Sequence, residues 1–302
     1  MSKYEYPKPS MKVLPFTVPK TSEEAFRLQV DIAPYLYDKL HQHPEIQIML
    51  IEQGEGTLIA GDYVGRFHPG NMFILGSNLP HVFRNDENYY KHKSKLRAHA
   101  ISIYFNENYF GEKFWQLDEL SLVRKLSTRA ERGLAVEGKL RASVRELIYD
   151  IQHQNGLPKL ILFFQALKVL TEFSELTPLS VSAYTEGYTL PEGKRMNDIL
   201  QFTFRESYRK IYIDEVAQVA NLSTEAFCRY FKLRTMKTYT NFLNEVRISQ
   251  ACKLLIQKEV SIQEICQQSG FSNLSNFNRI FRKVTGKTPT TYLPSLNNAT
   301  HD

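Results

Sequence analysis

Two histidines separated by one residue, His41 and His43, are the residues of this sequence best suited to chemistry. If their segment is a strand, residues 41, 43, 45 and 47 share one face, because side chains alternate between the two faces of a strand. A third histidine, His81, follows in a later segment that is also rich in β-forming residues. Imidazole nitrogens bind divalent metals or hydrogen-bond a small polar molecule. The pattern therefore indicates one of these two kinds of site, or histidines that only hold the structure together.

The same residues resemble the two motifs of the cupin barrel. Metal-binding cupins carry a His-x-His pair followed by a glutamate, and a further histidine on a later strand, but here Gln47 stands in place of the glutamate. A neutral carboxamide is a poorer ligand for a divalent cation than a carboxylate. We therefore expect no metal and interpret His41, His43, Gln47 and His81 as a pocket for a small effector. A metal-dependent dioxygenase or isomerase and a purely structural cluster are the alternatives.

Short strands separated by turns must position these side chains. β-branched, aromatic and aliphatic residues predict strands over 27–32, 45–52, 56–60, 72–75, 81–83 and 97–105, and this regular pattern predicts a sandwich or small barrel. After Phe110 the apolar residues follow helical spacing, which predicts amphipathic helices over 140–151 and 160–173. Their apolar faces would pack on the barrel or on a second subunit.

Composition and length set the class of protein. The chain has 302 residues, of which 42% are hydrophobic and 23% charged, as expected of a soluble globular protein with about two domains. It contains neither the roughly 18–20 consecutive apolar residues of a membrane span nor the apolar core of a secretory signal. The three cysteines, Cys228, Cys252 and Cys266, form no CxxC pair. This sparse cysteine usage favours a reducing compartment, and we expect a cytoplasmic protein without a membrane partner.

The positive charge belongs to the C-terminal third. Residues 193–295 contain 16 Lys and Arg against 8 Asp and Glu, whereas residues 1–192 contain 22 basic and 23 acidic residues. Such asymmetry predicts a polyanionic partner for the C-terminal part.

An internal repeat organises this basic part. Residues 213–232 and 262–282 match at an offset of 49 to 50, and each copy predicts a helix, a tight turn and a second helix. In the second copy, Ser261 and Asn273 are expected to cap the two helices and Gly270 to form the turn. Residues 239–258 predict a connecting helix that spans roughly 30 Å, comparable with the ~34 Å between successive major-groove faces on one side of DNA.

The segment SIQEICQQSGFSNLSNFNRIFRKVTGKTPTTY, residues 261–292, resembles the signature of AraC/XylS-family transcription regulators. The first copy departs from that family at Asn221, where glycine is usual, and at Met236, which corresponds to Gly286 of the second copy. The resemblance implies a set of residues that face DNA bases: Glu225, Cys228, Arg229, Ser275, Asn278 and Arg279. Arginine can pair with guanine and asparagine with adenine, whereas contacts to phosphate position the protein without reading sequence, a role we expect for Lys232, Arg282, Lys283 and Lys287.

These observations predict an α+β protein of two domains. A cupin-like barrel with following helices is expected over 1–175, a linker over 176–194, and an all-α double helix-turn-helix domain over 195–295. We expect a sequence-specific transcription regulator, more specifically an activator, that binds double-stranded DNA and a small effector, with sugars as one candidate class. We also expect a homodimer with no cofactor and no enzymatic activity, with RNA polymerase as a candidate partner. The alternatives are a metal-dependent cupin enzyme fused to a DNA-binding domain, and a constitutive regulator whose barrel only dimerises.

Overall fold

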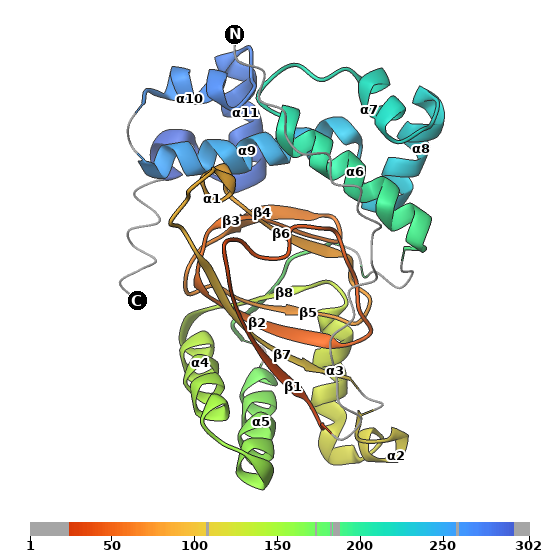
Figure 1. Cartoon of the computed structure of the whole chain (residues 1–302), viewed down its shortest axis with the longest axis vertical. Coiled ribbons are helices and arrows are strands. Elements are labelled where there is room, and N and C mark those ends of the chain that lie inside the picture. Colours follow the sequence, from red (N-terminus) through yellow and green to blue (C-terminus); the bar gives the residue numbers. More distant parts are fainter. Residues whose placement is uncertain are drawn as a thin grey trace.

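The computed structural model describes residues 24–106, 109–172, 174–181, 183, 188–257 and 260–292. Figure 1 shows two sheets in the middle of the molecule, a layer of helices from the C-terminal third on one side, and helices α3 to α5 on the other. The order along the chain is strands first and helices last, apart from two short strands within the helical segment that follows the barrel. The fold is therefore α+β, with an antiparallel sheet domain followed by a helical domain.

Two antiparallel sheets form the barrel-like domain. The larger contains, in spatial order, β1 (Arg27–Ala33), β7 (Ala98–Phe105), β2 (Ile46–Gln53), β5 (Met72–Leu75), β8 (Leu134–Val136) and β9 (Leu176–Pro178). The smaller contains β4 (Tyr63–Phe67), β3 (Gly56–Ala60) and β6 (His81–Asn85). The sequence pattern predicted six of these strands but not β4, β8 and β9. Strands β8 and β9 have three residues each, too few for alternation to be visible, and Gly65 interrupts the pattern of β4.

Apolar side chains fill both sides of the larger sheet. Between the sheets, Met49, Leu58, Phe73 and Phe83 belong to one buried cluster. On the outer face, a second cluster joins the sheet to α3 (Ser121–Ala130), α4 (Gly138–Gln152) and α5 (Gly156–Leu170). Short helical turns occupy α1 (Glu87–Tyr90), α2 (Glu112–Trp115) and η2 (Asp118–Leu120). Helix α5 begins four residues before the predicted start because a proline is tolerated in the first turn of a helix; Phe173, at its predicted end, lies outside the described residues.

The segment expected to link the domains, 176–194, begins and ends in regular structure. Strand β9 pairs with β8, and Leu176 is buried in the core. At the other end, α6 (Leu190–Glu206) starts with a capping box between Thr189 and Glu192 and a proline in its first turn. Pro191 and Gly193 predicted a turn, but proline is also favoured at the start of a helix.

The helical domain continues with α7 (Ile213–Val219), α8 (Thr224–Thr235), α9 (Tyr239–Gln257), α10 (Ile262–Gln268) and α11 (Leu274–Thr285). Helix α9 lies between the two copies of the repeat and contributes to two cores. Phe242 and Val246 pack with the first copy, and Ala251 and Leu255 pack with the second. A helix shared in this way holds both copies to one rigid rod. Within the described residues, no helix has the length and apolarity needed to cross a membrane.

Candidate nucleic-acid interface and histidine cluster

The second copy of the repeat forms a tightly turned pair of helices, α10 and α11. Ser261 and Glu264 form a capping box at the start of α10, and the Asn273 side chain accepts a hydrogen bond from the Asn276 backbone N–H at 2.9 Å. Gly270 has a φ of +86°, and a Cβ there would lie 2.1 Å from the Ser207 carbonyl oxygen. Only glycine fits both constraints. The caps and the turn predicted from the sequence are confirmed.

The first copy, α7 and α8, has left-handed residues at the same two places, in a turn that is one residue shorter. Asn221 adopts the left-handed conformation with a φ of 53°, as the corresponding Gly270 does. Ser223 caps α8 by accepting from the Ala226 N–H at 3.2 Å. Met236 ends α8 at a φ of 56°, and Gly286 ends α11 at 73°. The two departures from the family pattern therefore change the side chain and keep the left-handed backbone conformation at both positions.

One face of α8 and of α11 is buried and the other is exposed. Phe227 and Phe231 of α8, like Phe277 and Phe281 of α11, are fully buried. Every residue expected to face DNA is exposed, comprising Glu225, Cys228, Arg229, Lys232, Ser275, Asn278, Arg279, Arg282, Lys283 and Lys287.

Along α11 the exposed side chains are arranged around an open groove. Arg279 Nη2 donates to Asn276 Oδ1 at 2.8 Å, and Arg279 lines the groove together with Asn278, Arg282 and Lys283. Three cations and one amide next to each other make a surface suited to phosphates and base edges.

The three histidines of the barrel meet at one point. His41 and His81 form an antiparallel bridge, with the His41 N–H donating to the His81 carbonyl at 3.1 Å and the His81 N–H to the His41 carbonyl at 2.9 Å. Ring centroids lie 4.2 Å apart for His41 and His81, 5.2 Å for His43 and His81, and 6.1 Å for His41 and His43. His43 and His81 are buried and His41 is partly buried.

Each ring is oriented by a backbone carbonyl. The Nδ1 atoms of His41, His43 and His81 lie 2.8, 3.0 and 2.8 Å from the carbonyl oxygens of Lys39, Glu45 and Leu79. A carbonyl oxygen only accepts, so the proton of the neutral His41 and His81 rings is assigned to Nδ1, whereas both nitrogens of His43 face acceptor oxygens, because its Nε2 lies 3.4 Å from Gln47 Oε1. Burial lowers the pKa of all three rings, that of His41 to about 3, so the rings are neutral near pH 7.

Gln47 joins the cluster from β2, but its amide group is committed elsewhere. Gln47 Nε2 donates to Ser102 Oγ and to Tyr104 Oη, both at 3.0 Å, while Gln47 Oε1 lies 3.4 Å from His43 Nε2. Gln47 is paired with Tyr104 in the register of β2 and β7. Ser102 and Tyr104 are not among the residues that the histidine pattern predicts for this site, although two polar residues on one face of an apolar strand are a visible signal.

Comparison with known proteins identifies both parts of the chain. Residues 28–107 match the family described as "AraC-like ligand binding domain", and residues 216–295 match "Helix-turn-helix domain". Together these matches cover more than half of the sequence. The chain belongs to the AraC/XylS family. It is thus a DNA-binding transcription regulator that has a ligand-binding domain.

Curated relatives match this AraC-family regulator over most of both chains. It is 26% identical over 256 residues to the HTH-type transcriptional activator RhaS of Escherichia coli, a match that covers 82% of this chain and 85% of RhaS. It is 23% identical to the HTH-type transcriptional regulator YdeC of Bacillus subtilis, covering 85% and 86%. Among solved structures, ToxT of Vibrio cholerae is 14% identical, with a TM-score of 0.35 and coverage of 89% and 97%.

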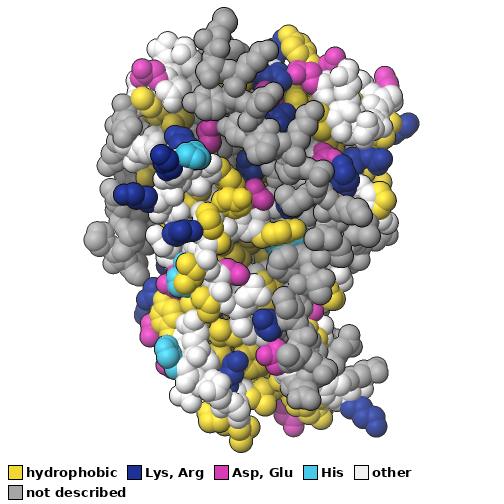
Figure 2. Space-filling model, viewed as in Figure 1, with side chains coloured by type: hydrophobic (Ala, Val, Ile, Leu, Met, Phe, Trp, Pro, Cys, Tyr) yellow, Lys and Arg dark blue, Asp and Glu magenta, His cyan; other side chains and the backbone are white. Residues whose placement is uncertain are grey.

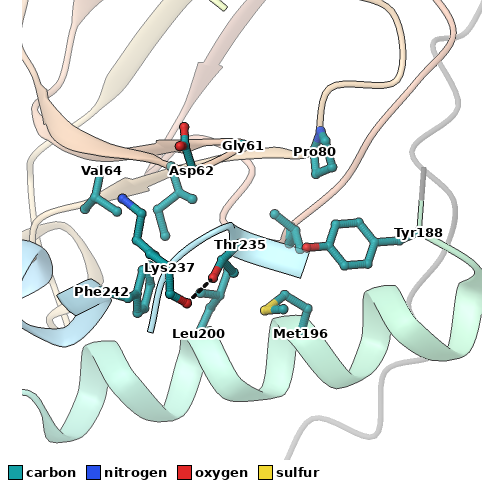
Figure 3. A pocket seen from close by; sticks show the side chains of 12 residues that line it. Gly61, Asp62, Val64, Pro80, Tyr188, Met196, Leu200, Thr235, Lys237 and Phe242 are labelled. Atoms are coloured by element: carbon teal, nitrogen blue, oxygen red, sulfur yellow. Dashed lines mark hydrogen bonds between the residues drawn. The ribbon is translucent and has the colours of Figure 1, made fainter. Parts of the chain in front are cut away.

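In this AraC-family regulator, the segment that carries His41 also contacts the helical domain. The Leu40 N–H donates to Asn197 Oδ1 of α6 at 3.3 Å. Gln42 Oε1 accepts from the Tyr188 N–H at 2.8 Å, and Gln42 Nε2 donates to the Tyr188 carbonyl at 3.3 Å. Figure 3 shows the pocket between the domains, with Pro80 on the barrel side and Met196 on α6.

Helix α9 lies on the smaller sheet through buried polar contacts. Thr57 Oγ1 of β3 and Ser249 Oγ of α9 are 2.8 Å apart, and both residues are buried. Asp86 accepts two hydrogen bonds from Arg66, at 2.6 and 2.9 Å, and its carboxylate lies 3.6 Å from Lys253 Nζ of α9. The rod that carries both helix-turn-helix units is therefore in direct contact with the ligand-binding domain.

Proposed function

We propose that this regulator is a sequence-specific activator whose affinity for DNA responds to a small ligand in the barrel. The observation that carries the proposal is the connection between the two sites. The paired helices α8 and α11 share α9, and α9 lies directly on the sheet that contains His81. The name of RhaS, a transcriptional activator, supports the direction of regulation.

The response follows from differential binding. A ligand shifts an equilibrium between two arrangements only if it binds one of them more tightly. In the described arrangement, Leu40 and Gln42, on either side of His41, are bonded to Asn197 and Tyr188. A ligand that moves His41 alters these bonds, and the position of α6 changes with them.

The proposal includes a homodimer in the cytoplasm, without enzymatic activity. Apolar side chains remain exposed on the edge strand β1 and on α5. Ile32 of β1 is 69% exposed and Leu157 of α5 is 67% exposed, and Val30 of β1 and Ile161 of α5 are exposed as well. Figure 2 shows hydrophobic side chains gathered on the lower part of one face, the region of β1, α4 and α5 in Figure 1. A second subunit would cover this surface, which leaves α8 and α11 accessible to DNA and to RNA polymerase.

Selection of bound sequences from a random DNA library, followed by fluorescence anisotropy on the selected site, tests the DNA-binding part. Arg279→Ala should lose about 1–3 kcal/mol on the selected site and relax the preference at one base pair. Lys283→Ala should weaken binding on all sequences alike and reduce the salt slope by about one unit. Arg145→Ala, on α4 and away from the helical domain, is the matched control.

Equal weakening by Arg279→Ala on every sequence would remove Arg279 from the base-reading set. An unchanged salt slope for Lys283→Ala would show that Lys283 does not contact phosphate. Selection that yields no sequence preference at all would overturn the sequence-specific function.

A further inference from the structure

The two copies of the repeat touch each other where the end of α6 meets the turn between α10 and α11. Helix α6 belongs to the first copy, since Met196 and Leu200 pack in the same core as α8. At Gly270, in the turn of the second copy, a Cβ would lie 2.1 Å from the Ser207 carbonyl oxygen and 3.1 Å from the Tyr208 carbonyl carbon. The two backbones therefore approach so closely that no side chain fits between them.

Arg247, in the middle of α9, bonds to the same place. Its Nε donates to the Ser207 carbonyl at 2.9 Å, and its Nη2 donates to the Arg209 carbonyl at 2.6 Å. The guanidinium carbon lies 5.6 Å from the ring centroid of Phe271, the residue that follows Gly270. One planar side chain thus joins the rod to the end of α6 in the first copy and to the turn of the second copy.

A guanidinium is suited to this junction. Carbonyl oxygens at the C-terminal end of a helix have no partner within the helix, and the helix dipole favours a cation there. Ser207 is the residue at which α6 ends. Arginine holds its donors in a rigid fork and can bond two carbonyls at once, whereas the flexible ammonium of lysine does not impose the same geometry.

Copies that pack against the same helix can still differ in their angle about its axis. Figure 1 shows α6 to α8 on the right of the helical layer and α10 and α11 on the left, with α9 between the two groups and the barrel. A contact between the copies that lies away from the axis of α9 fixes this angle. We propose that Arg247 is a positioning residue that sets the relative placement of α8 and α11, and thereby the number of base pairs between the two half-sites that they bind.

The geometry of DNA makes the number of base pairs a sensitive measure. One turn of about 34–36 Å contains about 10–10.5 base pairs, so each added pair shifts the second half-site by about 3.4 Å and rotates it by about 35°. A rigid pair of helices cannot follow this change. We expect the wild type to lose about 30-fold in affinity or more when one base pair is inserted or deleted, which corresponds to one or two lost base contacts.

The test rests on the proposed sequence-specific binding by both helices and uses the selected DNA site with the full-length protein. Fluorescence anisotropy compares this site with sites that have one base pair more or fewer between the half-sites. For Arg247→Met the change should cost no more than about threefold, less than one lost base contact. Gly270→Ala, which forces the junction apart, should relax the spacing too, and Arg247→Lys should lie between Arg247→Met and the wild type. The matched control is Arg205→Met, which removes the same charge from an exposed side chain of α6 and should keep the wild-type penalty.

Relaxed spacing with unchanged base preference within each half-site is the expected result, and circular dichroism verifies the fold of each variant. A folded Arg247→Met protein that binds all spacings equally less well than the wild type would overturn the proposal, because Arg247 would then only stabilise the domain. If Arg247→Met does not fold, Arg247→Lys provides the same comparison. A wild type that tolerates the inserted base pair, or a selected site with a single half, overturns the proposal whatever the variants do. Selection without any sequence preference would instead overturn the proposed function.

A distance measurement without DNA gives a second readout. Spin labels on the exposed Cys228 of α8 and on Ser275→Cys of α11 report the separation of the two helices by electron paramagnetic resonance. We expect a narrow distribution of distances with Arg247 in place and a broader one in Arg247→Met. Equal widths would show that the copies are held in position without Arg247 and would overturn the proposal, while leaving sequence-specific binding unaffected.

Discussion

The contact between α9 and the barrel can be measured through one buried hydrogen bond. Thr57 Oγ1 and Ser249 Oγ are 2.8 Å apart although their residues are 192 positions apart in the sequence. Thr57→Val keeps the shape of the side chain and removes its hydroxyl, and Ser249→Ala removes the other hydroxyl. The single variants each leave one buried hydroxyl without its partner, whereas the double variant removes both.

The expected changes in the free energy of unfolding follow from this difference between the single variants and the double variant. Leaving a buried hydroxyl unpaired costs about 1–3 kcal/mol, while replacing both partners by apolar groups is nearly neutral. Each single variant should therefore lower the free energy of unfolding by about 1–2 kcal/mol. The double variant should lose no more than the larger single loss, which gives a coupling energy of about 1–2 kcal/mol.

Urea unfolding of the wild type and the three variants, followed by circular dichroism, provides the cycle. The pair Thr57→Val and Ser272→Ala is the matched control, because Ser272 is exposed and distant changes add within about 0.3–0.5 kcal/mol. Strict additivity of Thr57→Val and Ser249→Ala would refute the reasoning. It would mean that α9 does not lie on β3 in solution and that the proposed route from barrel to DNA-binding helices is absent.

Three further predictions concern the helical domain and the dimer. The left-handed conformation costs a residue with a Cβ about 1–2 kcal/mol. Met236→Gly should therefore raise the melting temperature and Gly286→Ala should lower it. A lower melting temperature for Met236→Gly and a higher one for Gly286→Ala would show that the ends of α8 and α11 differ in solution. Burial raises the pKa of Cys252 to about 11, so a thiol reagent should label the exposed Cys228 first, and the selected DNA should slow this labelling if Cys228 faces the DNA bases. Ile161→Asp should shift the dimer toward monomer in sedimentation while changing stability by less than about 0.5 kcal/mol; a dimer that persists would place the interface elsewhere.

The sequence alone was sufficient for the features that depend on neighbouring residues. Ser261, Gly270 and Asn273 were expected to cap and turn the second helix-turn-helix, and the structure confirms all three, because a cap joins atoms only about three residues apart. The left-handed conformation of Asn221 can be predicted because asparagine tolerates it and because this position corresponds to Gly270. Helix α9 was predicted for a similar reason, since apolar residues recur along its 19 residues without a turn signal.

Only the tertiary structure decided which distant residues meet. His81 pairs through a β-bridge with His41, which lies 40 positions earlier in the sequence. Gln47 donates hydrogen bonds to residues 55 and 57 positions away. Helix α9 contacts β3 through Thr57. The three-residue strands β8 and β9 have too little local preference to form alone and exist because neighbouring strands pair with them. The amino-acid types at positions 41, 43 and 81 were sufficient to suggest a site. The direction of each Nδ1 and the unpartnered His81 Nε2 depend on backbone carbonyls and packing that no short-range pattern encodes.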